Sequence, residues 1–322
     1  MIKLKHQSGF IFVILVLILL SISCRNEDQD TDSEEIANEL QVEIVSEIAP
    51  EPSATDTQHC TTILNTTDLP DWLDDPMLIE VLDDGRIIVV GYSTSDSMAL
   101  ISADLETVEG YRFENGQGTL TAIRSDGLSI YALIVLILNE YDIRSGRHLG
   151  VSGSYEKGAI WNFDCDSDLF LTLSILNNEI SLMWINSAGA VIQSVSDPLR
   201  LDGDQNPLVM VPNGIALDSH QNAWVTSGAD GTVCIYRITG QLLSSFTNDQ
   251  IPVFIRRYRE KMLIGSGNSF SLYDLSGARL SAGILPEYCI DIDFNRNGNA
   301  VALTRRGEVI LMEIPSLDYV AE

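Results

Sequence analysis

Oxygen-bearing side chains alternate in one segment, where single residues separate Asp202, Asp204 and Asn206. Hard cations such as Ca²⁺ prefer oxygen ligands, and this spacing is that of the opening of a calcium-binding loop. However, Pro207 stands at the sixth position, where an EF-hand loop needs glycine, and no glutamate follows six residues on. We therefore interpret the stretch that begins at Asp197 as a solvated loop, with a partner-binding loop as the alternative.

Catalytic signatures are absent from the sequence. It contains no GxSxG nucleophile elbow, HExxH pair, P-loop or dinucleotide-binding glycine pattern. The four histidines fall in the leader, in the tether and in two expected turns, so a general base with a partner nucleophile cannot be assembled from them. The sequence favours a role without catalysis.

The N-terminus has the features of an export signal. Two lysines precede an apolar run of eleven residues, Phe10 to Leu20, which is shorter than the roughly 20 residues needed to span a bilayer. The following Ser-Ile-Ser-Cys resembles the bacterial lipobox, with Ser21 where Leu is usual. The resemblance implies that a signal peptide, residues 1–23, is removed and that Cys24 is lipidated. The resemblance also implies the outer rather than the inner membrane, because Arg25 stands where lipoproteins retained in the inner membrane resemble one another in having Asp. An ordinary secretory signal and an uncleaved anchor are the alternatives.

Residues 24–58 are expected to form a disordered acidic tether. This segment contains eleven acidic residues and a single basic residue, Arg25, and such a composition does not support a packed core. A stalk helix is the alternative, because Ile36, Leu40, Ile44 and Ile48 recur at helical spacing. The whole chain carries 46 acidic and 19 basic residues, a net charge of −27. Nucleic acid is excluded as a partner, because its binding requires Lys and Arg to displace counterions.

Residues 59–322 repeat a pattern of short apolar strands separated by polar turns, at intervals of about 40 residues, which is the length of one four-stranded propeller blade. Helical periodicity is absent there. The turns that recur once per repeat include Asp83-Asp84-Gly85, Ser125-Asp126-Gly127, Asp166-Ser167-Asp168, Asn297-Gly298, Ser145-Gly146, Thr239-Gly240 and Ser276-Gly277. The pattern predicts an all-β, six-bladed β-propeller of antiparallel blades, in monomeric form.

Ring closure follows from the burial of apolar faces. A four-stranded unit with two apolar faces must stack on neighbours, and only a closed ring leaves no bare end. We expect the segment from Cys60 to Thr67 to pair with the last blade and latch the ring. Cys60 and Cys289 would then lie close together, and export allows a disulfide between them.

Two repeats carry a family resemblance. Pro212-Asn213-Gly214-Ile215-Ala216-Leu217-Asp218 with Asn222-Ala223-Trp224 resembles an NHL repeat, and Pro286 to Asn299 is a weaker copy. The first segment also resembles the gluconolactonase and paraoxonase propellers, which hold a divalent cation at the channel mouth. This resemblance implies Asn213, Glu287 and Asp75 as ligands of Ca²⁺ or a similar cation, although the family's Glu-Gly-Pro is missing. Otherwise Asn213 only shapes a turn.

These observations predict a lipid-anchored, exported propeller that binds a protein or carbohydrate of the cell envelope, with no cofactor and with the lipid as its only membrane contact. One alternative is a cation-dependent lactonase or esterase that acts at the channel mouth. A second alternative is a structural envelope protein.

Overall fold

The structure is a computed structural model. The residues that it describes belong to one compact unit, Ala49–Glu322. They are 58–73, 75–91, 98–114, 120–126, 129–134, 137–151, 159–166, 169–176, 179–199 and 212–314. No helix in these ranges has the length and apolar character needed to cross a membrane.

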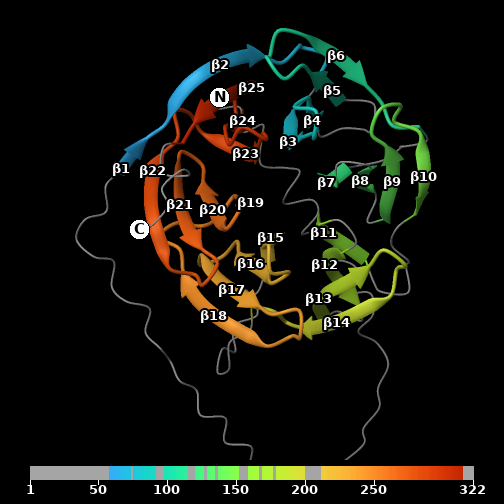
Figure 1. Cartoon of the computed structure of the whole chain (residues 1–322), viewed down its shortest axis with the longest axis vertical. Coiled ribbons are helices and arrows are strands. Elements are labelled where there is room, and N and C mark those ends of the chain that lie inside the picture. The colour runs from blue at the N-terminus through green and yellow to red at the C-terminus, as the bar shows by residue number, and fades with distance from the viewer. Residues whose placement is uncertain are drawn as a thin grey trace, which may run out of the picture. The chain divides into compact units, whose positions relative to one another are not determined.

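Six antiparallel sheets stand around a central axis, so the predicted six-bladed propeller is confirmed (Figure 1). Blade one is β3 (Pro76–Val81), β4 (Ile87–Gly91), β5 (Met98–Ile101) and β6 (Val108–Tyr111). Blade two is β7 (Leu120–Ser125), β8 (Ser129–Ile134), β9 (Ile137–Asp142) and β10 (His148–Val151). Blade three is β11 (Ala159–Asp166), β12 (Leu169–Leu176), β13 (Glu179–Asn186) and β14 (Val191–Ser196).

The other three blades follow the same inner-to-outer order. Blade four is β15 (Pro212–Leu217), β16 (Ala223–Ser227), β17 (Thr232–Tyr236) and β18 (Leu242–Thr247). Blade five is β19 (Phe254–Tyr258), β20 (Lys261–Ser266), β21 (Ser269–Asp274) and β22 (Arg279–Ile284). Blade six is β23 (Cys289–Phe294), β24 (Ala300–Thr304), β25 (Glu308–Glu313) and, from the other end of the domain, β2 (Thr62–Asp68).

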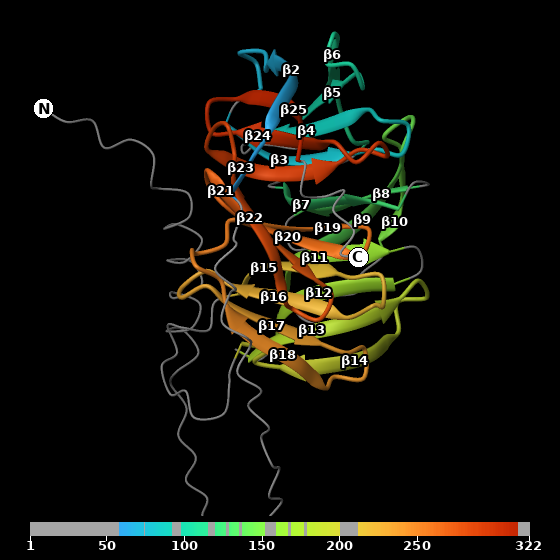
Figure 2. The ribbon, with the colours of Figure 1, turned by 60° about the vertical axis from the view of Figure 1, so that its left-hand side comes forward.

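The predicted latch is therefore confirmed. Strand β2 is the outermost strand of blade six and runs antiparallel to β25, from Thr62 opposite Glu313 to Asp68 opposite Glu308. The short strand β1 (Gln58–Cys60) precedes it and pairs in parallel with β22, at the outer edge of blade five. Figure 2 shows β2 lying over the edge of blade six, beside β25. The strand from the N-terminal side thus closes the ring by pairing with β25.

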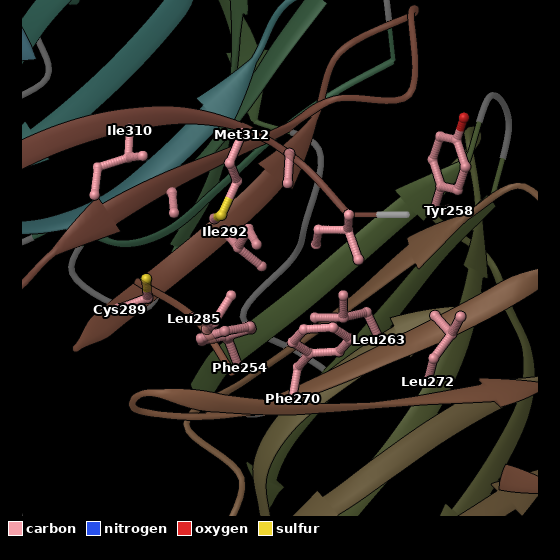
Figure 3. Packing of buried hydrophobic residues seen from close by; sticks show 13 residues of the cluster. Phe254, Tyr258, Leu263, Phe270, Leu272, Leu285, Cys289, Ile292, Ile310 and Met312 are labelled. Atoms are coloured by element: carbon pink, nitrogen blue, oxygen red, sulfur yellow. The ribbon is translucent and has the colours of Figure 1, made fainter. Parts of the chain in front are cut away.

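Apolar packing between blades completes the circle. Among the described residues, six buried clusters are found, and each joins two neighbouring blades. Figure 3 shows the cluster between blades five and six, where Phe254 and Phe270 lie near Leu285 and Ile292. The second strands β4, β8, β16 and β24 are buried at every residue because both of their faces meet another blade. Glycines with positive φ, Gly240 (+82°) and Gly277 (+90°), stand at the predicted outer turns.

Candidate functional site

The axial channel is bordered by strand edges that need hydrogen-bond partners. Each inner strand pairs with one strand of its own blade, as β3 does with β4, so its other edge faces the axis. A buried N–H without a partner costs about 1–3 kcal/mol. The channel must therefore supply acceptors for these N–H groups and donors for the carbonyls.

Four carboxylates supply the acceptors, and each reaches from the inner strand of one blade to that of the next. Because the acceptor lies on the preceding blade, every such bond also joins two blades. The N–H groups of Ile79, Val81, Ser125 and Leu217 donate to Asp291, Asp293, Glu80 and Asp164, respectively.

Two buried arginines supply the donors and pair with the same carboxylates. The Arg124 Nε lies 2.9 Å from an Asp164 oxygen, and its Nη1 lies 3.9 Å from a Glu80 oxygen. The Arg256 Nη2 lies 2.6 Å from an Asp291 oxygen. Each guanidinium also donates to the carbonyl of the residue before it. We call this set the charge ring; its members are Glu80, Arg124, Asp164, Arg256, Asp291 and Asp293.

Blade four interrupts the charge ring, since β15 carries no charged residue. A further ion pair, outside the charge ring, spans the gap. Arg257 on β19 of blade five lies 2.8 Å from Asp166 on β11 of blade three, and both side chains are partly exposed. The ionic contacts therefore continue past blade four at the end of the channel where the inner strands finish.

Burial raises the pKa of two carboxyls in the ring, Glu80 and Asp293. It raises the pKa of Glu80 well above its ordinary value, and repulsion from Asp293 adds to this effect, against the opposing attraction of Arg124 and Arg256. Burial also raises the pKa of Asp293. For Arg124, burial opposes the charge, but Asp164 and Glu80 outweigh it and raise the pKa of the guanidinium. These groups hold neighbouring blades together, while the buried Arg256 Nε has no hydrogen-bond partner.

Two of the three predicted cation ligands, Asn213 and Glu287, have local structural contacts. The half-buried Asn213 donates its amide N–H to the Pro252 carbonyl, which ties blade four to the segment before blade five. A Glu287 oxygen lies 3.3 Å from Arg306, and Asp75 is exposed with φ +44°. Within the described ranges, no group of three or more His, Cys, Asp or Glu residues could hold a metal ion. Cation binding at the channel mouth stays a prediction.

The predicted binding loop is described only at its start. Asp197 follows β14, has φ +46° and donates its N–H to a β13 carbonyl at 2.8 Å. Asp202, Asp204 and Asn206 lie outside the described residues, as does Cys24. The roles predicted for these four residues stay predictions.

The predicted disulfide between Cys60 and Cys289 is not formed in the structure. Cys289 carries a free, buried thiol whose Sγ lies 3.4 Å from the Glu287 carbonyl oxygen. The physical reason lies in the topology. The latch residues that reach blade six are those of β2, whereas Cys60 ends β1 at the outer edge of blade five, and Cys289 begins the innermost strand of blade six.

One exposed aromatic residue that sequence reasoning missed is Tyr288, which immediately precedes β23. We call the end of the propeller where the inner strands begin the N-face. Tyr288 lies there with 45% of its surface exposed. A Cβ added to Gly267 would come within 2.6 Å of its ring, and the Arg305 guanidinium lies 5.6 Å from the ring centre. The backbone N–H of Arg305 also donates to the backbone carbonyl of Tyr288 at 2.9 Å. A turn of blade five and a turn of blade six thus hold this side chain from two sides.

Comparison with known proteins supports the fold alone. No protein-family model matches the sequence, and no curated protein matches it significantly. A streptogramin B lyase structure has a TM-score of 0.55 at 11% identity and covers 78% of this chain and 97% of its own. The WD40 β-propeller domain of Doa1 has a TM-score of 0.55 at 15% identity, over 82% and 100% of the two chains. BBS1N, solved in complex with ARL6DN, has a TM-score of 0.52 at 12% identity, over 80% and 98%.

Proposed function

We propose that this protein is an exported, lipid-anchored propeller that binds another protein through its N-face. The leader and the lipobox-like segment that ends at Cys24 support export and anchoring, most simply in the outer membrane. The acidic tether supports display at a distance from the lipid surface. The observation that carries the binding role is Tyr288, which is exposed and also lies against Gly267 and Arg305.

Tyr288 and Arg305 have the chemistry of an interface anchor. Tyrosine and arginine are enriched among the few residues that dominate the energy of protein interfaces. An aromatic ring that is already fixed in place loses little side-chain entropy on binding, so more of its contact energy appears as affinity. Because Gly267 and Arg305 hold the ring in the free protein, the site is organised before a partner arrives.

The interior of the propeller supports the same proposal by contrast. The charged side chains of the channel are engaged in contacts between blades, and the described residues include no metal cluster. Among the similar structures, one is described as a WD40 propeller domain and another was solved with a protein bound. Binding of a protein partner is therefore compatible with the side chains that the described residues provide.

Binding can be tested with the full-length protein in detergent-solubilised envelopes. A partner is identified by crosslinking, and its affinity is then measured for Tyr288→Ala and Arg305→Ala. Loss of an anchor of this kind lowers affinity by about 30-fold, corresponding to roughly 2 kcal/mol. The matched control is Ile192→Ala on the outer strand β14, which is half exposed and far from Tyr288 in the blade order. Equal affinity of all three variants for the partner would refute the N-face as the binding surface.

Export and anchoring are tested separately. The full chain labelled with a fatty acid in growing cells should incorporate the label, and Cys24→Ser should lose both the label and the membrane association. A Cys24→Ser protein that still fractionates with the membrane would show that the leader stays uncleaved or that a partner holds the propeller there.

A further inference from the structure

A groove runs between the segment before β3 and the outermost strand of blade one. Its volume is about 450 Å³, and it is lined by Trp72, Val108, Gly110, Tyr111 and Arg112. This volume falls in the range of about 300–1,000 Å³ that is common for small-molecule sites. Trp72 is 49% exposed, although a residue of its size would usually be covered. The groove thus offers a large aromatic surface to solvent.

Two further features keep the groove open and polar. A Cβ added to Gly110 would meet no atom within 4 Å, so the strand wall is open where any other residue would place a side chain. The Ser102 N–H donates to the Thr107 carbonyl at 3.0 Å, which sets the alternation of the β5–β6 ladder. By that alternation, the main-chain groups of Val108 and Gly110 point away from β5 and are presented at the sheet edge.

The chemistry of the groove selects a neutral ligand with a ring. Arg112 is the charged residue of the lining, and no carboxylate lines it, which disfavours a cation. The net charge of −27 disfavours a free anion. Strand β6 has only four residues, which is short for pairing with an extended peptide. A saccharide fits what remains, since its C–H face stacks on the Trp72 indole while its hydroxyls bond to the main-chain groups at the edge of β6.

We propose that this groove is a binding site for neutral carbohydrate, of the size of one or two sugar rings. Trp72 provides the stacking surface, and the edge of β6 at Gly110 provides the hydrogen-bonding wall. The lining of this groove includes neither Tyr288 nor Arg305. It goes beyond the proposed protein-binding function and does not depend on it.

The groove can be tested by tryptophan fluorescence of the full-length protein in detergent. Trp184 and Trp224 are fully buried, so acrylamide quenches chiefly Trp72, with a contribution from the half-buried Trp161. The probes are cellobiose, maltose and N,N′-diacetylchitobiose, with sialyllactose and chitosan disaccharide as charged comparators. We expect at least one neutral disaccharide to protect Trp72 from quenching at millimolar concentration and the charged sugars to protect it less.

Two matched variants decide whether protection arises in the groove. Gly110→Leu should fill it and weaken binding at least about tenfold, a loss that corresponds to roughly 1.4 kcal/mol. Gly150→Leu, on the equivalent outer strand β10, also has open space at its Cβ and should bind like the parent protein. The proposal is overturned if no neutral sugar protects Trp72, if charged sugars protect it better, or if both leucine variants behave alike. Tyr288→Ala should keep sugar binding, so the two sites can fail separately.

Discussion

Replacing Asp291 by alanine should destabilise the propeller strongly. This carboxylate is 3% exposed and receives three hydrogen bonds, from Arg256 at 2.6 Å and from the N–H groups of Ile79 and Ile292 at 3.0 Å each. Breaking a buried ion pair by removing one partner costs about 3–5 kcal/mol, because the other charge stays buried. The orphaned Ile79 N–H adds about 1–3 kcal/mol. Because these costs overlap, we expect a loss of about 4–6 kcal/mol in the free energy of unfolding.

The assay is urea unfolding followed by far-ultraviolet circular dichroism, with the midpoint compared between variants. Asp291→Asn keeps an acceptor oxygen for the backbone and should fall between alanine and the parent protein. The control is Asp83→Ala, which breaks an ion pair with Arg296 at 3.0 Å in which both side chains are more than half exposed. Exposed pairs of this kind contribute about 0–1 kcal/mol. If Asp291→Ala unfolds at the same urea concentration as Asp83→Ala, the charge ring does not hold the blades together.

Three other predictions concern groups buried in or beside the blades. Because the pKa of Glu80 is raised in the folded state, the folded protein holds this proton more tightly than the unfolded chain and loses stability as pH rises from about 4.5 through the raised pKa. Urea unfolding at a series of pH values should show this loss, and Glu80→Gln should make it smaller. The prediction is contradicted if stability depends on pH equally in the variant and the parent protein. A Cβ at Gly265 would come within 1.9 Å of the Phe254 ring, so Gly265→Ala should lower the free energy of unfolding by about 1–3 kcal/mol or more. The loss is measured as a lower midpoint of thermal unfolding. A midpoint equal to that of the parent protein would show that the ring moves aside. Burial raises the pKa of the Cys234 and Cys289 thiols to about 12, so iodoacetamide should modify them at pH 8 only in urea; rapid alkylation of the native protein would show that these blades open.

The fold was predictable because its signals are local and repeated. Alternating apolar residues, turn glycines and a blade-length interval are each visible in a single repeat, and closure follows from the need to bury both faces of every sheet. The latch was predictable for the same reason, since a three-stranded last blade requires an outer strand. The disulfide was not, because the residue that reaches blade six depends on where β1 ends and β2 begins, and no local pattern fixes that boundary.

The charge ring has a sequence signal that only the closed ring makes interpretable. A charged residue follows a buried apolar one in inner strands, as in Ile79-Glu80, Ile123-Arg124 and Ile255-Arg256. In a single strand such a charge indicates a solvent-facing position. In six strands around one axis, it faces the strand edge of the next blade instead. The meaning of the pattern therefore depends on a contact between residues far apart in the chain, which a reading of one repeat cannot contain.

The segment of blade four that resembles an NHL repeat is explained by packing within the propeller and not by either proposed binding function. Asp218, fully buried, ends the Gly-Ile-Ala-Leu-Asp stretch and accepts hydrogen bonds from the N–H groups of His220 and Asn222 and from the Trp224 indole, so it organises the turn from β15 to β16. At Gly214 an added Cβ would lie 3.0 Å from an Ile255 methyl group, so the glycine lets blade five pack closely. These residues build a blade and need no ligand. Tyr288 and Trp72 stand instead in the connections between blades, where the chain varies more readily than in the strands and binding specificity can change without rebuilding the ring.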